Sequence, residues 1–230
     1  MKIVILCGGL GSRLGELTKK IPKPMVKIGK IPLVEHIMNF YNSYGFNDFI
    51  LAGGYKYDVI FKYFKNQKKF KNVKVINTGK NTLTGLRILK LKKYLINQEN
   101  FMLTYGDGLS DQNLNKLIKF HFKHKKIATL TAVRPPVRFG ELELSRSSVK
   151  KFAEKPQAKS GWINGGFFVF NKKIFNYLLK RNEMLEKGPI ERLVKKRNLV
   201  AFKHHGFWQC MDTMRDKELL EKKIKRVTKI

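Results

Sequence analysis

Residues 2–14 read Lys-Ile-Val-Ile-Leu-Cys-Gly-Gly-Leu-Gly-Ser-Arg-Leu. Residues 2–6 form a short, mostly apolar run, which is typical of a buried strand. The glycines that follow permit positive φ angles and a close backbone approach, because glycine has no Cβ, so several N–H groups of such a loop can face one anion. This stretch therefore predicts a strand that ends in an anion-binding loop, with Arg13 directly after it.

The sequence of this loop excludes two familiar phosphate-binding loops. It has no Gly-Lys-Ser or Gly-Lys-Thr ending, as a P-loop requires, and Leu14 stands where the dinucleotide fingerprint needs its third glycine. Lys23 follows Arg13 by ten residues, and prolines on both sides stiffen the chain around it. Taken singly, each feature is more typical of a plain strand-to-helix turn with solvated cations. Together, two fixed cations beside a Gly-rich loop suit a triphosphate.

Strand and helix signals alternate through the first 133 residues. Short apolar runs predict strands, whereas apolar residues at helical spacing predict the helices between them. Strands are expected at 2–6, 48–52, 73–76, 101–105 and 127–133, and helices at 33–44, 59–64, 84–96 and 111–124, the last capped by Asp111. This alternation predicts an α/β fold, a Rossmann-like open and mostly parallel sheet with helices on both faces.

The pattern changes after Pro135 and Pro136. Strands are expected at 139–144, 149–154 and 162–170, and a final helix at about 213–225. These elements predict further strands for the sheet and a small additional β-rich lobe. Ligands of such sheets bind beyond the carboxyl ends of the parallel strands, so site residues are expected in the loops at those ends.

Two acidic residues lie in such loops. Asp107 lies between Gly106 and Gly108, directly after the strand at 101–105, and Asp212 lies just before the last helix. Mg²⁺ prefers one or two carboxylates together with phosphate oxygens and water, so two acids on convergent loops would suit it. The alternative is structural, with Asp107 in a turn hydrogen bond and Asp212 as a helix cap. The residues alone leave both interpretations open.

The charge of the chain has two explanations. Its 230 residues include 48 Lys+Arg and 17 Asp+Glu, which gives a formal net charge of +31. A polyanionic partner such as nucleic acid would suit this excess. However, the cations are mostly Lys rather than Arg, the better bidentate reader of phosphate, and they are scattered along the chain. Compositional bias is therefore favoured, and we expect no specific nucleic-acid partner.

The sequence also bears on cellular location and on metals other than magnesium. Cys7 and Cys210 lie far apart and define neither a disulfide framework nor a metal cluster. The opening apolar run is too short for a signal peptide, and no stretch could span a bilayer. We expect a cytoplasmic protein without membrane insertion, with a homo-oligomer left open. Zinc at His121 and His124 is not favoured, because no third ligand is near, and a partly exposed helix face is expected there.

Beyond the opening loop, further motifs follow in a fixed order and together resemble one family, the sugar-1-phosphate nucleotidylyltransferases. The motifs are Gly8-Gly9-x-Gly11-Ser12-Arg13-Leu14, Lys23-Pro24-Met25, Tyr105-Gly106-Asp107-Gly108, Phe139-Gly140, Glu154-Lys155-Pro156, Asn164-Gly165-Gly166-Phe167-Phe168 and Phe207-Trp208-Gln209-x-Met211-Asp212-Thr213. Within this family, Thr78-Gly79 and Thr84-Gly85-x-Arg87 are most similar to the glucose-1-phosphate cytidylyltransferases. Leu86 and Cys210 depart from the pattern, which usually has Gly and Pro there.

The resemblance implies the nucleotide-diphospho-sugar transferase type of fold and a set of site residues. The whole chain would be one domain, with a nucleotide-binding half at about 1–133 and a sugar-phosphate-binding half at about 134–230. The implied catalytic residues are Arg13, Lys23 and Lys155, and the implied Mg²⁺ ligands are Asp107 and Asp212. The implied nucleotide-binding residues are Leu6, Gly8, Gly9, Gly11, Ser12, Arg13, Lys23, Thr78, Gly79, Gly85 and Asp107. Those implied for the sugar phosphate are Gly140, Glu154, Lys155, Asn164 and Gly166.

The implied activity is nucleotidyl transfer from a nucleoside triphosphate to a sugar 1-phosphate, with release of pyrophosphate. The subfamily resemblance implies CTP and glucose 1-phosphate, and related enzymes supply nucleotide sugars for cell-surface polysaccharides. One alternative is the same reaction with another base or another phosphorylated acceptor. A second alternative is a basic nucleic-acid-binding or non-catalytic protein built on the same fold.

Overall fold

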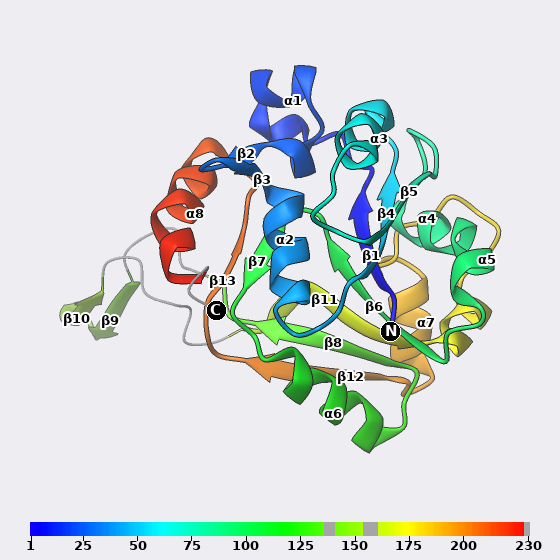
Figure 1. Cartoon of the computed structure of the whole chain (residues 1–230). Helices are drawn as coiled ribbons and strands as arrows, with labels where there is room; N and C mark the ends of the chain where they lie inside the picture. Colours follow the sequence, from blue (N-terminus) through cyan, green and yellow to red (C-terminus); the bar gives the residue numbers. More distant parts are fainter. Residues whose placement is uncertain (136–140, 154–160, 228–230) are drawn as a thin grey trace.

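A seven-stranded sheet forms the middle layer of the molecule, in the order β12-β8-β11-β6-β1-β4-β5 (Figure 1). The computed structural model describes residues 1–135, 141–153 and 161–227. The strands of this sheet are β1 (Ile3–Cys7), β4 (Asp48–Gly53), β5 (Asn72–Asn77), β6 (Asn100–Tyr105), β8 (Ala128–Val133), β11 (Ile163–Asn171) and β12 (Leu199–His204). Only β11 runs antiparallel to its neighbours, β6 and β8. The expected mostly parallel sheet is therefore confirmed.

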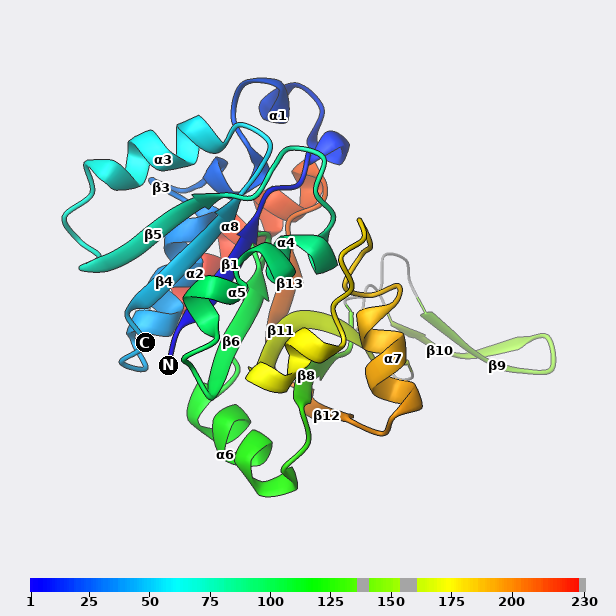
Figure 2. The same ribbon diagram turned by 90° about the vertical axis from the view of Figure 1, so that its right-hand side faces the viewer.

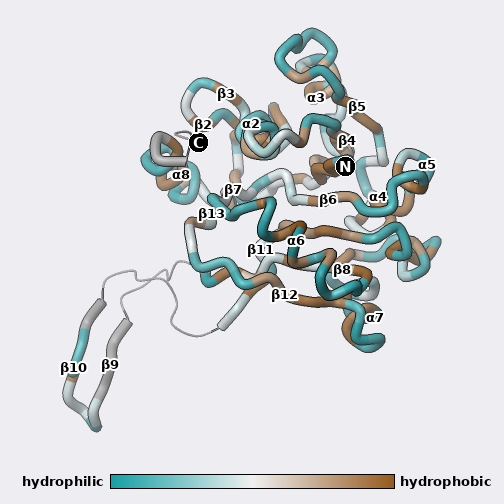
Figure 3. The backbone as a smooth tube through the Cα atoms, turned by 60° about the horizontal axis from the view of Figure 1, so that its bottom comes forward, coloured by the Kyte–Doolittle hydropathy of each residue, from teal (hydrophilic) through white to brown (hydrophobic). Residues whose placement is uncertain are grey.

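The inner strand β1, which lies between β6 and β4, shows why the opening run of the sequence is apolar at every position after Lys2. Successive side chains of a strand point to opposite faces of the sheet. Ile3 and Ile5 belong to one buried cluster, whereas Val4 and Leu6 belong to the other. Both faces are thus covered, and such a strand is expected to be continuously hydrophobic rather than alternating. Figure 3 shows the apolar residues concentrated along the strands.

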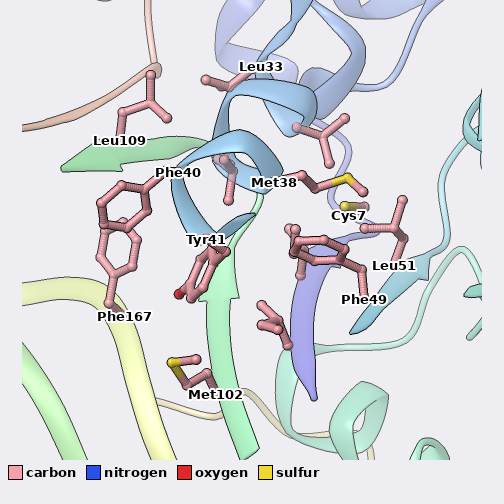
Figure 4. Packing of buried hydrophobic residues seen from close by; sticks show 14 of the residues in the cluster. Cys7, Leu33, Met38, Phe40, Tyr41, Phe49, Leu51, Met102, Leu109 and Phe167 are labelled. Carbon is pink, nitrogen blue, oxygen red and sulfur yellow. The ribbon is translucent and has the colours of Figure 1, made fainter. Parts of the chain in front are cut away.

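Helices cover the two faces of the sheet (Figure 2). One face carries α2 (Leu33–Asn42), α3 (Tyr57–Lys65), α6 (Leu114–His124) and α8 (Met214–Val227). The other carries α4 (Thr84–Lys90), α5 (Lys92–Leu95), the 3-10 helix η3 (Lys172–Asn176) and α7 (Pro189–Lys195). On the first face, α2 directs Met38 and Tyr41 towards Phe49 and Met102 of the sheet (Figure 4).

Two helix predictions need correction. The helix expected at 84–96 is divided at Leu91 into α4 and α5. Asp111 does not cap α6: the cap is Asn113, whose side chain accepts a hydrogen bond from the backbone N–H of Lys116 at 2.9 Å. Asp111 instead lies 3.0 Å from the His204 ring. An asparagine two residues further on satisfies the free N–H groups of the first helical turn equally well.

Short elements complete the chain on both sides of the large sheet. Between β1 and α2 lie η1 (Ser12–Leu14), α1 (Glu16–Lys20), η2 (Lys23–Met25), β2 (Lys27–Ile28) and β3 (Ile31–Pro32). In the second half, β9 (Glu141–Ser145) and β10 (Ser148–Ala153) pair with each other in a hairpin that projects from the body of the molecule (Figure 1). Among the described residues, no helix is both long enough and apolar enough to cross a membrane.

A small ribbon, β7 (Gly108–Ser110) paired with β13 (Trp208–Cys210), was not expected from the sequence. Its strands are antiparallel, with Gly108 opposite Cys210, and the N–H of Met211 donates to the carbonyl oxygen of Asp107 at 2.8 Å. This ribbon joins two segments that lie about one hundred residues apart in the chain. It brings the residues around Asp107 and Asp212 to the same place.

Candidate active site

A cavity of about 860 Å³ opens where β1 and β6 end. Its wall combines the loop after β1, the end of β6, the start of β11, the end of β13 and part of the segment between β5 and α4. Eleven of the residues that the sequence predicts for the site line this cavity: Leu6, Gly8, Gly9, Gly11, Ser12, Arg13, Lys23, Asp107, Asn164, Gly166 and Asp212. This is the side of a parallel sheet on which ligands are expected.

The remaining expected residues fall into two groups. Thr78, Gly79 and Gly85 are not part of the cavity wall and lie behind it. Gly140, Glu154 and Lys155 lie outside the described residues. The Gly-rich loop and the acid pair, Asp107 and Asp212, are thus gathered at one cavity. The roles expected for Gly140, Glu154 and Lys155 stay predictions.

The Gly-rich loop closes tightly against the rest of the site. Gly11 has a φ of 66° and accepts a hydrogen bond from the N–H of Leu14 at 3.0 Å, which starts the single turn of η1. A Cβ on Gly8 would lie 2.0 Å from Nη1 of Arg87, whereas a Cβ on Gly9 would meet nothing within 4 Å. The absence of a side chain is therefore a steric requirement at Gly8 and a matter of open access at Gly9.

The acid pair of the site converges on Lys23. The Nζ of Lys23 lies 2.6 Å from Oδ2 of Asp107 and 2.6 Å from Oδ1 of Asp212. Arg13 adds a second cation, with Nη1 at 2.7 Å from Oδ2 of Asp212. Burial opposes the charge on Lys23, but the two carboxylates outweigh it and raise the pKa of its ammonium group above the usual value. Two cations and two carboxylates thus form one closed cluster.

The structural alternative for Asp212, a helix cap, does not account for the contacts of its carboxylate. The first turn of α8 is capped by Thr213, whose Oγ1 accepts from the N–H of Asp216 at 3.2 Å. Asp216 returns the bond, since its Oδ2 accepts from the N–H of Thr213 at 2.8 Å and from the N–H of Asp212 at 3.1 Å. This reciprocal capping arrangement leaves the carboxylate of Asp212 directed at Lys23 and Arg13.

The donor set of the cluster fits a divalent cation such as Mg²⁺. Oxygens of Asp107 and Asp212 come from different elements and already surround one positive centre, the ammonium group of Lys23. Carboxylate oxygens are the protein ligands that Mg²⁺ prefers. A metal ion between these carboxylates would require the ammonium group to move away. Cys210 is nearby, but burial and the neighbouring Asp212 and Asp107 raise the pKa of its thiol to about 12, so it stays protonated.

Arg87 is a residue of this region to which the sequence analysis gave no role. Its side chain is 3% exposed, and it donates hydrogen bonds to the carbonyl oxygens of Gly53 at 2.8 Å and Thr82 at 2.6 Å. Longer bonds of 3.3 Å reach the carbonyl oxygens of Gly8 and Gly79. This one guanidinium joins the Gly-rich loop, the end of β4 and the segment before α4.

The contacts of Thr78 explain why this residue lies behind the cavity. Thr78 is 1% exposed, and its hydroxyl donates a hydrogen bond to the carbonyl oxygen of Gly53 at 2.5 Å and accepts one from Arg87. Gly85 is likewise enclosed, since a Cβ there would lie 2.8 Å from the carbonyl oxygen of Glu183. Thr78 therefore supports the wall through its hydroxyl and Gly85 through a close backbone approach, and neither offers a group to the cavity.

Glu186 is a wall residue that the sequence analysis did not name. Its carboxylate accepts hydrogen bonds from the hydroxyls of Thr84, at 3.1 Å, and Tyr105. Asn164 donates to the same Tyr105 oxygen at 3.3 Å. Burial, followed by the charge of Glu186, raises the pKa of Tyr105 well above its usual value, so its hydroxyl stays a donor. Glu186 lies in an irregular segment before α7, where no periodicity marks it out.

Strand β11 is irregular at Gly165 and Gly166, and this irregularity is fixed from two directions. Gly166 has a φ of 77°, and a Cβ there would lie 2.7 Å from the ring of Tyr105. Nε1 of Trp208 donates to the carbonyl oxygen of Gly165 at 2.7 Å. The N–H of Gly166 also donates to Oδ1 of Asn164 at 2.9 Å. This wall of the cavity is therefore shaped by a register shift in β11, where Gly166 has a backbone conformation that only glycine adopts easily.

The histidine pair of α6 lies away from this cavity. His121 and His124 both lie near Oγ1 of Thr129, at 2.8 Å and 2.7 Å. His121 is 3% exposed, so the expectation of a partly exposed helix face is wrong for it. Burial, together with the neighbouring His124, lowers the pKa of His121 to about 4. Its neutral form is thus built into the packing of α6 on β8.

Comparisons with known proteins agree on one family. The sequence profile of the nucleotidyl transferase family matches residues 2–219. A "glucose-1-phosphate cytidylyltransferase" of Salmonella typhi is 42% identical over 243 residues, which cover 96% of this chain and 95% of that protein. A "probable glucose-1-phosphate cytidylyltransferase" of Bacillus subtilis is also 42% identical, and the match covers 96% of this chain and 94% of that protein. The solved structure of HddC from Yersinia pseudotuberculosis is 25% identical, with a TM-score of 0.76. The match covers 97% of this chain and 99% of that chain.

Proposed function

The chain belongs to the nucleotidyl transferase family, and from this membership we propose that it transfers a cytidylyl group from CTP to glucose 1-phosphate and releases pyrophosphate. One observation carries the proposal: two cations and two carboxylates meet beside a Gly-rich loop, in a chain that is 42% identical to curated glucose-1-phosphate cytidylyltransferases along nearly its whole length. The product would be a nucleotide sugar, the activated donor for glycosyl transfer.

The reaction needs little covalent work from the protein. An oxygen of the sugar phosphate forms a bond to the α-phosphorus of the triphosphate, and the bond between that phosphorus and the oxygen bridging to the β-phosphorus breaks. The electron pair leaves with pyrophosphate. A phosphate nucleophile is already anionic near neutral pH, so no general base is required. Catalysis of this kind rests on positioning and on charge stabilisation.

The proposed work of the cations follows from where they lie. Arg13 and Lys23 are fixed beside the Gly-rich loop, so they would hold the triphosphate and stabilise the charge that develops on departing pyrophosphate. Gly8, Gly9 and Gly11 would let the phosphates approach the backbone closely. Lys155 is expected to align the sugar phosphate, and Glu154 to bind the sugar hydroxyls.

We propose Mg²⁺ as the metal of this site, held by Asp107 and Asp212. When bound, the ion supplies neutralisation of phosphate charge and a template for the reacting groups. Asn164 and Glu186 also line the cavity, where both contact the hydroxyl of Tyr105, and they would offer amide and carboxylate groups to the sugar or ribose. The cytoplasm, where nucleoside triphosphates are made, is the proposed place of action.

Pyrophosphate release tests this function and its substrates together. The purified protein is incubated with Mg²⁺, each of the common nucleoside triphosphates in turn, and glucose 1-phosphate or another sugar phosphate. Release that needs both CTP and glucose 1-phosphate is the expected result. Release with a different pair would keep the chemistry and overturn the proposed substrates. No release with any pair from folded protein would overturn the proposed function.

A further inference from the structure

The acid pair is already occupied by cations of the protein itself. Lys23 bridges Asp107 and Asp212 at 2.6 Å each, and its side chain is only 12% exposed. Arg13 reaches the other oxygen of Asp212 at 2.7 Å. The two groups proposed to bind the triphosphate are therefore held on the two groups proposed to bind the metal.

We propose that Lys23 is a placeholder cation, which closes the acid pair until metal ion and triphosphate arrive together and thereby makes their binding mutually dependent. This inference rests on the proposed function of the site. It assigns to Lys23 a role in the free enzyme, in addition to the contact with the triphosphate that the proposed function gives it. The structural basis is the exchange of partners that the metal ion and the triphosphate would impose on Lys23 and the acid pair.

Neither the metal ion alone nor the triphosphate alone gives every charged side chain of the cluster a partner. A metal ion that enters alone displaces the ammonium group of Lys23 and leaves it largely buried without its carboxylates, which is costly. A triphosphate that enters alone draws Lys23 away and leaves two carboxylates beside a polyanion. When both bind, the metal ion takes Asp107 and Asp212, and the phosphates take Lys23 and Arg13. The favourable exchange therefore needs both the metal ion and the triphosphate.

The local structure permits this exchange without rearrangement of the fold. The backbone of Lys23 is held in η2 between Pro22 and Pro24, where Pro24 is buried. The lysine side chain is a flexible stem with a compact charge, so its head can change partners while its backbone stays in place. Arg13 is less suited to this role, because its side chain is 71% exposed and contacts only Asp212 of the pair.

Metal binding without nucleotide is the direct test. Mn²⁺ affinity is measured by electron paramagnetic resonance in the wild type, in Lys23→Met and in Lys20→Met, the last of which removes an exposed lysine near the same loop. We expect Lys23→Met to bind one Mn²⁺ about tenfold or more tightly than the wild type, since a tenfold change is well below the cost of displacing a buried charge. Lys20→Met should match the wild type.

A second measurement locates the gained site. Adding Asp107→Asn to Lys23→Met should remove the gained Mn²⁺ affinity. In parallel, the ratio of CTP affinities with Mg²⁺ and with EDTA should be smaller in Lys23→Met than in the wild type, because coupling between two ligands is reciprocal. Chelation of Mg²⁺ by free CTP is common to both proteins and cancels from this comparison.

Three results would overturn the placeholder role. The first is equal Mn²⁺ affinity of Lys23→Met and the wild type, in variants whose thermal unfolding shows an intact fold. The second is a gain that survives Asp107→Asn. The third is an unchanged ratio of CTP affinities. Each can occur in a protein that releases pyrophosphate, so failure of this inference is distinguishable from failure of the proposed function, which the substrate panel tests.

Discussion

Single side chains hold the cavity together across long stretches of sequence. Lys23 contacts carboxylates that lie 84 and 189 residues further along the chain. Arg87 lies 34 residues from Gly53 and 79 residues from Gly8, and it bonds to both carbonyl oxygens. The contacts of these residues show which substitutions should affect catalysis and which should affect stability.

Asp107→Asn should lower turnover about 100-fold or more and leave the fold intact, because it removes one of two charged oxygen donors proposed for the metal ion. The measurement is the rate of pyrophosphate release at saturating substrates, with circular dichroism as the check of folding. Asp58→Asn is the matched control, since it removes an exposed carboxylate of α3. Turnover of Asp107→Asn close to that of this control would refute the assignment.

Arg87→Met should destabilise the protein by about 2–4 kcal/mol, because four carbonyl oxygens around the guanidinium would each lose one hydrogen bond at once. Denaturant unfolding measures this loss. Arg215→Met, at an exposed position of α8, is expected to change stability little. If the two variants unfold at the same denaturant concentration, Arg87 does not have the structural role described here. The Michaelis constant for the triphosphate should also rise in Arg87→Met, since the Gly-rich loop loses a support.

The loop after β1 contains two neighbouring glycines, Gly8 and Gly9, that differ in the space available for a side chain. A Cβ at Gly8 would overlap the Arg87 guanidinium, whereas a Cβ at Gly9 would meet nothing within 4 Å. Gly8→Ala should therefore lose about 1–3 kcal/mol of unfolding free energy, the usual cost of overpacking, and Gly9→Ala should lose much less. Thermal unfolding of the two variants measures this difference. Equal stability, or a larger loss at Gly9, would contradict the packing of Arg87 under this loop.

The elements also show what the sequence could and could not predict. The strands around β1 were predictable because buried parallel strands are continuously apolar. The ribbon of β7 and β13 was not, since strands of three residues carry too little periodicity and their pairing partner lies far away in the chain. The cap at Asn113 was misassigned to Asp111, because both residue types cap helices and only the backbone geometry selects between them.

The same distinction holds for the site. The family expected from the motifs is confirmed by the profile match over residues 2–219. The motifs marked Lys23, Asp107 and Asp212, which share one cluster. Arg87 and Glu186 received no role, because a buried arginine within an apolar helix and a glutamate in an irregular segment become recognisable only through their partners. Nor does spacing in sequence show that Lys23 itself lies between the acids.

For the whole molecule, the buried histidine of α6 makes stability depend on pH. The pKa of His121 is about 4 in the folded protein, below the value of 6.5 expected for an exposed histidine. The unfolded chain therefore binds more protons between these two values, and stability should fall as the pH is lowered from about 6.5 towards 4. This contribution fades above about pH 6.5, where the histidine of the unfolded chain also loses its proton.

Unfolding by urea at pH 7 and pH 5 measures this effect. The wild type should lose more stability between the two pH values than His121→Asn, which cannot take up the proton. His205→Asn, at an exposed histidine, should behave as the wild type does. An equal loss in the wild type and His121→Asn would show that other groups carry the acid sensitivity.

The proposed function requires that the cavity at the ends of β1 and β6 transfers the nucleotidyl group only with a bound metal ion. The most direct measurement is the formation of the nucleotide sugar itself, followed by mass spectrometry, from CTP and glucose 1-phosphate with Mg²⁺ present or chelated. We expect equal amounts of nucleotide sugar and pyrophosphate from the wild type with Mg²⁺, and almost none in EDTA or from Asp107→Asn. Undiminished product in EDTA, or from folded Asp107→Asn, would contradict the proposed metal-dependent transfer.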